Sequence, residues 1–400
     1  MNILSDRINT LSESETLAMA RRSRELSAKG VDVINLSIGQ PDFNTPDFIK
    51  EAGKSAIDEN YTTYTPVAGF DELREKVAQK LARDNNLNYT ASQVVVSTGA
   101  KQALANAIMS LVNPGDEVIV PTPYWVSYRE LIKLAEGKAV YIPTKIENDF
   151  KITPDELEAS ITDKTKMFLF NSPNNPSGTI YTKEELSALA DVFAKYPNIF
   201  IISDEIYELI NFEGKHESIA QFDTIKDRVV IINGVSKAFA MTGWRLGYSV
   251  SNLEIATACN KYQGQITSGT CAISQRAAIK ALEADPFTLK ESKEMLASFH
   301  KRRDILIDGL NGIEGFKTNV PPGAFYVFPE ISALFGKKYN GKVIKDSIDF
   351  CDLVLDVAHV AIVPGSAFGD ANCVRFSYAA SEKNILEAVL RIKNLTEKFE

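Results

Sequence analysis

The 400-residue sequence has little of what membrane, secreted and metal-binding proteins are rich in. No apolar run is long enough to span a bilayer. Residues 1–16, MNILSDRINTLSESET, carry charges and have no apolar centre, so we expect no signal peptide. The four cysteines include no C-x-x-C pair, and the three histidines are far apart with no H-E-x-x-H pattern. These absences predict a cytoplasmic protein with reduced thiols and no metal site.

Two common nucleotide-binding motifs are also missing. No G-x-G-x-x-G run follows a strand, which disfavours a nicotinamide site. The segment GKKYNGKV at 336–343 approaches the P-loop pattern, but it ends in Val343 and follows no clear strand, so we interpret it as a solvated loop. The formal net charge of −8 disfavours binding to nucleic acid or to an anionic membrane. It does not exclude small anionic substrates, which a few local cations can bind.

The middle of the chain alternates short β-rich runs with helical patterns. This rhythm predicts an α/β fold, with a mainly parallel sheet flanked by helices on both faces. Near-continuous apolar runs such as VVIIN at 229–233 are typical of strands buried on both sides. The strands are expected at 93–97, 116–121, 138–143, 166–170, 198–203, 228–233 and 245–250, and the helices between them at 101–112, 125–137 and 182–196.

The length of the chain and a change in its sequence pattern predict two domains. A chain of 400 residues is longer than one hydrophobic core usually supports. After about residue 285 a charge-rich helical stretch leads into PPGAFYVFPEI at 321–331 and then into further α+β sequence. The N-terminal part holds a helix at 14–30 and a short strand at 33–39. We expect a large domain at 46–284 and a smaller α+β domain formed by 1–45 and 285–400.

Polar or aromatic residues follow most of the expected strands. In open α/β sheets ligands bind outside the carboxyl ends of the strands, so these side chains should converge on one crevice. Each has an ordinary structural explanation when taken alone: Asp204 suits a helix N-cap, and Trp125 suits a core. Their occurrence at successive strand ends favours a ligand site. The residues concerned are Thr98, Gly99, Ala100, Lys101, Trp125, Asn171, Asn174, Asn175, Asp204, Glu205, Tyr207, Ser236 and Lys237.

The chemistry of these residues fits pyridoxal phosphate (PLP). This cofactor needs a lysine for a Schiff base, an acid beside the pyridine nitrogen and an anion site for its phosphate. Lys237 suits the first role, because the pKa of a lysine amine falls when it is buried or near other cations. Asp204 suits the second, and Tyr207 is placed to donate to the ring oxygen. Trp125 could stack on the ring face.

The phosphate end of such a cofactor also has candidates. Arg245 lies eight residues after Lys237, and Ser236 precedes that lysine directly. The segment Gly99, Ala100 and Lys101 opens a helix, whose first backbone N–H groups favour an anion. The stretch 234–248 would then hold the cofactor at both ends.

The chain resembles the class I aminotransferases of PLP fold type I, in the branch of bacterial aspartate aminotransferases. The likeness extends over essentially the whole chain. Any one of its motifs would be weak, but together they are very specific. They are SIGQPDF (37–43), YTPVAG (64–69), PYWVSY (123–128), NSPNNPSG (171–178), SDEIYE (203–208), SKAFAMTGWRLGY (236–248), PPGAFYVF (321–328) and VRFSYA (374–379).

The resemblance implies further roles and an assembly. Asn175 would join Tyr207 at the ring oxygen, and Tyr64 would reach the phosphate in the neighbouring subunit of a homodimer with shared active sites. Arg375 would capture the α-carboxylate of the amino acid, a task that suits its planar fork. The other residues expected to bind the substrate are Gly39, Trp125 and Asn175.

The resemblance implies transamination of L-aspartate with 2-oxoglutarate to oxaloacetate and L-glutamate, in a ping-pong reaction through pyridoxamine phosphate. One branch of aspartate aminotransferases binds the side-chain carboxylate with an arginine of the partner subunit, but the segment 265–272 contains no arginine. In the branch that this chain resembles a lysine does so, which makes Lys101 the candidate. Ser14 and Thr16 are expected to close over the site.

Several alternatives stay open at this point. Some relatives also transaminate prephenate; certain of those carry a lysine where Ser12 stands here, and others rely on Thr16 and Lys101. An aromatic or alanine aminotransferase is an alternative within the class. From other classes, a PLP-dependent lyase or carbon–carbon synthase on the same fold, or a PLP-dependent regulator or catalytically silent binding protein, remain as hypotheses.

Overall fold

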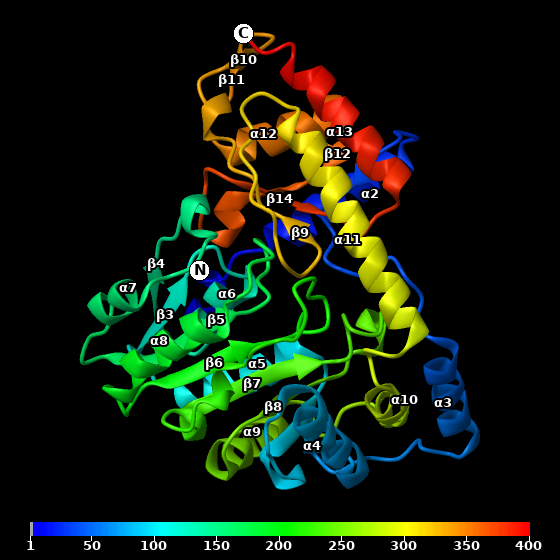
Figure 1. The fold of residues 1–400 in the computed structure, drawn as a ribbon, viewed down its shortest axis with the longest axis vertical. Coiled ribbons are helices and arrows are strands. Elements are labelled where there is room, and N and C mark those ends of the chain that lie inside the picture. The colour runs from blue at the N-terminus through cyan, green and yellow to red at the C-terminus, as the bar shows by residue number, and fades with distance from the viewer. Residues whose placement is uncertain (1–2) are drawn as a thin grey trace.

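A computed structural model describes residues 3–400 and has a seven-stranded sheet at its centre (Figure 1). Neighbouring strands pair in parallel except at β8, which is antiparallel to both of its neighbours. The mainly parallel α/β sheet predicted from the sequence is therefore confirmed. In spatial order the strands are β2 (Val94–Ser97), β8 (Gly247–Val250), β7 (Val229–Gly234), β6 (Phe200–Asp204), β5 (Thr165–Asn171), β3 (Glu117–Pro121) and β4 (Lys138–Ile142).

Helices cover both faces of this sheet. Alternate residues of β7 show why the strand is apolar throughout, because Ile231 belongs to the core on one face and Val230 and Ile232 to the core on the other. The first face is covered by α3 (Asp47–Asp58), α4 (Asp71–Asn85), α8 (Lys183–Ala194) and α10 (Ala272–Glu283). The second is covered by α5 (Ala100–Leu111), α6 (Ser127–Leu134) and α9 (Leu253–Ile266).

A separate core joins the two ends of the chain. Strand β1 (Ile34–Asn35) pairs in parallel with β12 (Val360–Ala361), and a small antiparallel sheet has the order β13-β14-β9. This second core forms the upper part of the molecule in Figure 1. The domain boundaries at 45/46 and 284/285 stay a prediction. The remaining elements here are α2 (Glu15–Ala28), α11 (Lys290–Asn311), α12 (Ser347–Leu353), α13 (Glu382–Thr396), β9 (Tyr326–Val327), β13 (Val363–Pro364) and β14 (Val374–Ser377).

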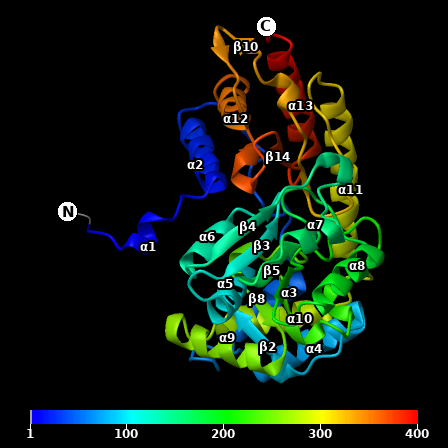
Figure 2. The same cartoon turned by 90° about the vertical axis from the view of Figure 1, so that its left-hand side faces the viewer.

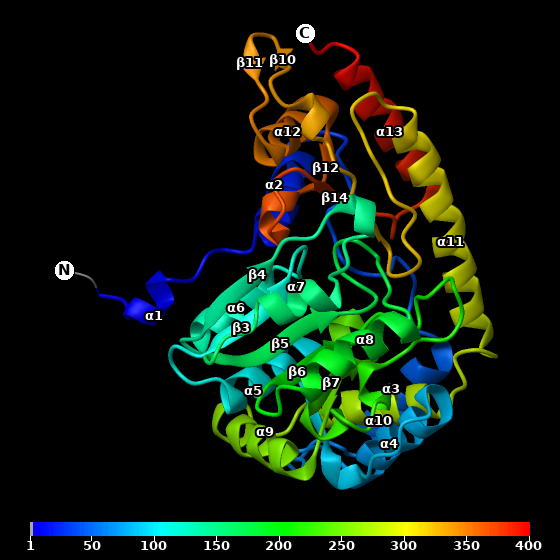
Figure 3. The ribbon, with the colours of Figure 1, turned by 60° about the vertical axis from the view of Figure 1, so that its left-hand side comes forward.

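Two peripheral features complete the fold. The P-loop-like segment is an antiparallel pair, β10 (Lys338–Tyr339) with β11 (Lys342–Val343). Helix α1 (Asp6–Asn9) projects from the body of the molecule (Figures 2 and 3), where Arg7 forms an ion pair of 2.5 Å with Glu136. Among residues 3–400, no helix is long and apolar enough to cross a membrane.

Strand β8 begins at Gly247, two residues later than the sequence predicted. Its first residue makes a tight contact with the start of α5. Arg245 has a left-handed backbone with φ 55°, so the extended strand begins only at Gly247. A Cβ on Gly247 would lie 2.2 Å from the backbone nitrogen of Ala100. The start of α5 can therefore rest directly on β8 only because this residue is glycine.

We predict that Gly247→Ala destabilises the fold by about 1–3 kcal/mol, because the added methyl group overlaps backbone that cannot move aside cheaply. Gly264→Ala is the matched control: it lies in α9, and its Cβ would meet Val67 at an ordinary 3.7 Å. There we expect unchanged or slightly higher stability, by about 0.5 kcal/mol. Urea unfolding of both variants measures the difference, and equal effects would contradict the contact argument.

Candidate active site

The carboxyl ends of the central strands open into one cavity of about 390 Å³. It lies where the sheet meets the second core, since Tyr326 and Arg375 of the small antiparallel sheet also line it. The convergence expected from the strand ends is thus present in the structure. The predicted site residues that line the cavity are Ser14, Thr16, Gly39, Ala100, Lys101, Trp125, Asn171, Asn175, Asp204, Tyr207, Ser236, Lys237, Arg245 and Arg375.

Lys237 follows β7 and points toward the segment that links the two cores. Its Nζ donates a hydrogen bond of 2.6 Å to the carbonyl oxygen of Gly39. Burial lowers the pKa of the Lys237 amine to about 8, and the positive charges of Arg245 and Arg375 act in the same direction. A sizeable fraction of this amine is therefore neutral near physiological pH, as a nucleophile or general base requires.

Asp204 is the last residue of β6 and is buried. The hydroxyl of Tyr128 donates to its Oδ2 at 2.8 Å, and the backbone amide of Ile206 donates to Oδ1 at 3.3 Å. Burial raises the pKa of Asp204 to about 6, although both hydrogen bonds act to lower it. Within residues 3–400 no lysine or arginine forms an ion pair with this carboxylate. Its surroundings favour a cationic partner from outside the chain.

A cradle for an anion lies at the start of α5. Gly99 caps this helix with φ 84°, and a Cβ there would lie 2.4 Å from Nη2 of Arg245. The backbone amides of Ala100 and Lys101 begin the helix beside this guanidinium. Arg245 Nη1 donates to the carbonyl oxygen of Thr242 at 3.0 Å. The close approach of backbone and guanidinium depends on the absence of a side chain at Gly99.

Arg375 is a buried guanidinium without a carboxylate partner in the described chain. It donates to Asn175 Oδ1 at 3.0 Å and to the Ser37 carbonyl oxygen at 2.6 Å. The rings of Tyr326 and Phe368 lie 4.6 and 4.8 Å from its Cζ. Its Nε is buried with no hydrogen-bond partner. An uncompensated buried cation is costly, so this geometry is typical of a receptor for an anion.

Lys101 and Thr16 lie on the wall of the same cavity. The Lys101 ammonium is 4.8 Å from the centre of the Trp125 ring. Burial lowers the pKa of Lys101, and the charge of Arg245 lowers it further. The Thr16 hydroxyl oxygen is buried and has no hydrogen-bond partner among the described residues. Both side chains are thus placed to meet a polar ligand.

Sequence reasoning missed two tyrosines, and it also named residues that do not line the cavity: Tyr64, Thr98, Gly99, Asn174 and Glu205. Tyr128 holds Asp204, and its spacing of three residues from Trp125 in a helical pattern was a signal that the two share a face. Tyr326 shares a hydrogen bond of 2.8 Å with the Tyr207 hydroxyl. No local signal pointed to it, because it arrives through long-range pairing of β9 with β14. The predicted Tyr64 lies outside the cavity with its side chain 98% exposed.

Comparisons with known proteins agree with this fold and site. The sequence profile of the family "Aminotransferase class I and II" matches residues 31–392. A bifunctional aspartate aminotransferase and glutamate/aspartate-prephenate aminotransferase from Petunia hybrida is 45% identical, over 98% of this chain and 82% of its own length. An aspartate/prephenate aminotransferase from Cereibacter sphaeroides is 44% identical, over 98% of both chains.

Solved structures agree as well. The aspartate aminotransferase of Rhizobium meliloti superposes with a TM-score of 0.95 at 41% identity, over 99% of each chain. The Thermus thermophilus aspartate aminotransferase with maleate gives 0.91 at 38% identity, over 99% of this chain and 100% of that one. Fold and site together define an enzyme that transfers amino groups. The chain belongs to the class I and II aminotransferase family, and its cofactor is pyridoxal phosphate.

The residues present fit that cofactor. A lysine with a lowered pKa, a buried carboxylate without a cationic partner, and a guanidinium beside helix amides all face one cavity. They match the cofactor's carbonyl, pyridine nitrogen and phosphate in chemical type. The cradle at Gly99, which a Cβ would fill, is a structural reason to place the phosphate there.

The lowered pKa of Lys237 gives a testable pH dependence. Attack on a carbonyl needs the neutral amine, so covalent uptake of pyridoxal phosphate by the cofactor-free protein should become faster as the pH rises and level off above about 8. Arg375→Leu removes a charge that lowers this pKa, so the midpoint should move to higher pH. Arg375→Lys keeps the charge and should keep the midpoint. Borohydride reduction and peptide mass confirm attachment at Lys237; an unmoved midpoint in Arg375→Leu would contradict the electrostatic argument.

Proposed function

We propose that the protein transaminates L-aspartate with 2-oxoglutarate to give oxaloacetate and L-glutamate, in a ping-pong reaction. The observation that supports it best is the occurrence of Arg375 and Lys101 on the wall of one cavity. A dicarboxylic amino acid needs a cation for each carboxylate, and these two residues provide them. Relatives named aspartate aminotransferase at 42–45% identity support the same substrate.

A second activity toward prephenate is supported by a specific comparison. The Petunia and Cereibacter relatives carry prephenate in their names. Prephenate is also a dicarboxylate, so the same pair of cations would suit it. Thr16, which lines the cavity and whose buried hydroxyl has no partner among the described residues, would be an added contact.

The roles of the residues follow from their positions. When bound, pyridoxal phosphate supplies a carbonyl that combines with the substrate amine and a ring that withdraws electrons from Cα. Lys237 Nζ would act as a base and take the proton from Cα. It would then act as an acid and give this proton to the cofactor carbon that is bonded to the transferred nitrogen. Arg375 would hold the α-carboxylate, which keeps Cα near Lys237. Asp204, held by Tyr128, would keep a proton on the ring nitrogen.

The other cofactor contacts are assigned in the same way. Tyr207 and Asn175 would bond the ring oxygen, while Trp125 would stack on the ring. The phosphate would be held by Ser236, Arg245 and the backbone of 99–101. Gly39 would contact the substrate, since its carbonyl oxygen already lies beside Lys237.

The proposed assembly is a homodimer with shared active sites in the cytoplasm. Tyr64 is 98% exposed and lies outside the cavity of its own chain, which supports a role toward a second subunit. Helix α1 projects from the body with Ile8 52% exposed, which favours an intersubunit contact for this arm (Figure 2). The division into domains at 46–284 and 1–45 with 285–400 is part of the same proposal.

The central prediction concerns Lys237. L-aspartate added to the cofactor-loaded enzyme without an oxo acid should remove the carbonyl-form absorption band and produce that of pyridoxamine phosphate. Lys237→Ala should still bind the cofactor but convert it at least about 10²-fold more slowly, because the proton has no carrier. Lys261→Ala, an exposed lysine of α9, is the control and should behave like the wild type. Near-normal conversion by Lys237→Ala would overturn the assignment.

The dicarboxylate preference depends on Lys101. In Lys101→Ala we expect kcat/KM for L-aspartate to fall by about 10- to 100-fold, the cost of a lost charge-assisted hydrogen bond. Turnover of L-alanine, which has no second carboxylate, should change much less, and Lys101→Arg should retain part of the aspartate activity. Equal effects on aspartate and alanine would instead place Lys101 at the cofactor, and no effect on either would favour an aromatic or alanine aminotransferase.

A further inference from the structure

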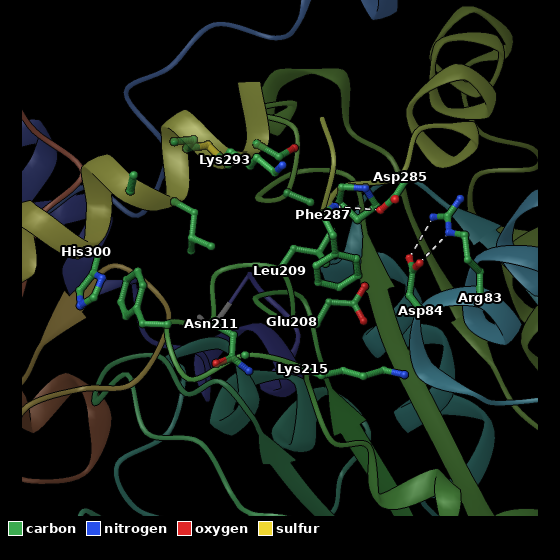
Figure 4. Close-up of a pocket in the computed structure, with 18 residues that line it drawn as sticks. Arg83, Asp84, Glu208, Leu209, Asn211, Lys215, Asp285, Phe287, Lys293 and His300 are labelled. Carbon is green, nitrogen blue, oxygen red and sulfur yellow. Dashed lines mark hydrogen bonds and ion pairs between the residues drawn. The ribbon is translucent and has the colours of Figure 1, made fainter. Parts of the chain in front are cut away.

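A second cavity, of about 790 Å³, lies apart from the catalytic one (Figure 4). It is enclosed by the end of α4, the segment 208–215, the loop 285–287 and the first half of α11. None of the residues that line it also lines the catalytic cavity. Its wall nevertheless includes Glu208 and Ala238, the chain neighbours of Tyr207 and Lys237. Its volume is within the range of about 300–1,000 Å³ that is usual for small-molecule sites.

The walls of this cavity are largely apolar and aromatic. Leu209, Phe212, Met295 and Leu296 line it, together with Phe287, whose side chain is 49% exposed. Such an exposed ring at the edge of an apolar hollow has a face available for stacking. In the view of Figure 4, Phe287 and Leu209 lie in the middle of the cavity wall. These surfaces suit a ligand with an aromatic body.

The acidic groups of the cavity already have partners. Asp84 receives two hydrogen bonds from the Arg83 guanidinium, at 2.6 and 2.9 Å. Glu208 forms a buried ion pair with Lys80. Asp285 accepts a backbone N–H two residues further along the chain, at 2.9 Å. Asp84 and Glu208 are therefore neutralised by cations, whereas Asp285, which also accepts from the Thr288 hydroxyl at 3.1 Å, has no lysine or arginine partner in residues 3–400.

Two lysines of the cavity are in the opposite situation. The ammonium groups of Lys215 and Lys293 have no ion pair or hydrogen bond to any residue in 3–400. Figure 4 shows them on opposite sides of the cavity, Lys293 above and Lys215 below. The cavity therefore has unpaired positive charge next to an aromatic surface.

We propose that this cavity binds an organic anion with an aromatic body and no amino group, such as an aromatic carboxylate or 2-oxo acid. The unpaired lysines would hold the anionic group, while Phe287 and its apolar neighbours cover the ring. A zwitterionic amino acid is disfavoured, because its ammonium group would meet two free ammonium groups and only one carboxylate without a cationic partner, that of Asp285, which already accepts two hydrogen bonds. The proposed site uses no residue of the catalytic cavity, and only the maleate block in its test rests on the proposed dicarboxylate substrate.

The test uses the cofactor-loaded enzyme with saturating maleate, so that a dicarboxylate occupies the catalytic cavity. The probe is 8-anilinonaphthalene-1-sulfonate, an aromatic anion whose fluorescence rises in an apolar site. We expect saturable binding that 3-phenylpropanoate reverses and L-phenylalanine does not. Absence of saturable binding, or equal displacement by the two competitors, would overturn the proposal.

Charge-reversal variants locate the site. Lys293→Glu should weaken probe binding about tenfold or more. Lys290→Glu is the matched control, because Lys290 is exposed on the same helix, does not line the cavity and already pairs with Glu294 at 3.7 Å. If thermal unfolding shows that Lys293→Glu is misfolded, Lys215→Glu on the opposite side of the cavity takes its place, and it too should weaken probe binding. Equal affinity in wild type and both cavity variants would place the probe elsewhere and refute the assignment.

Discussion

The catalytic arrangement depends on the parallel register of β6 and β7. This register pairs Asp204 with Ile232, so the carboxylate and the exit toward Lys237 reach the same edge of the sheet. A slip of one residue would turn the Asp204 side chain to the opposite face. The register is fixed by apolar residues on both faces of each strand, since every strand residue of β7 is buried. The packing of the sheet therefore determines the position of the chemistry.

The site also holds charges that the protein itself does not neutralise. Arg375 is buried among two aromatic rings and hydrogen-bond acceptors, and Asp204 has only neutral donors. Burying such groups costs stability, and the pKa of Lys237 is lowered by burial first and then by the same surplus of positive charge. The phosphate and protonated ring nitrogen of the cofactor, together with the carboxylates of a substrate, would supply the missing partners. The shifted pKa values are thus a sign of function rather than of poor packing.

The sequence predicted best what is local. The seven strands and the residues at their ends were found because apolar runs and turn chemistry are encoded within a few positions. The antiparallel direction of β8 was not specified, although the segment 234–247 has no long crossover helix and so permits a reversal. The position of Tyr326 depends on long-range strand pairing. The hydrogen bond from Arg375 to Asn175 joins residues that are 200 positions apart in the sequence. Such contacts leave no periodic signal.

Three hydrogen bonds cross the cavity from the central sheet region to segments outside it. Lys237 reaches Gly39, Tyr207 reaches Tyr326, and Asn175 accepts from Arg375. Arg375, the proposed receptor for the α-carboxylate, therefore comes from β14, whereas Lys237, the proposed carrier of the Cα proton, follows β7. Proton transfer needs both to be placed within a fraction of an ångström, so it is sensitive to how the second core rests on the sheet. Packing changes far from the cavity, in either core, should consequently alter turnover without touching a residue that contacts the substrate.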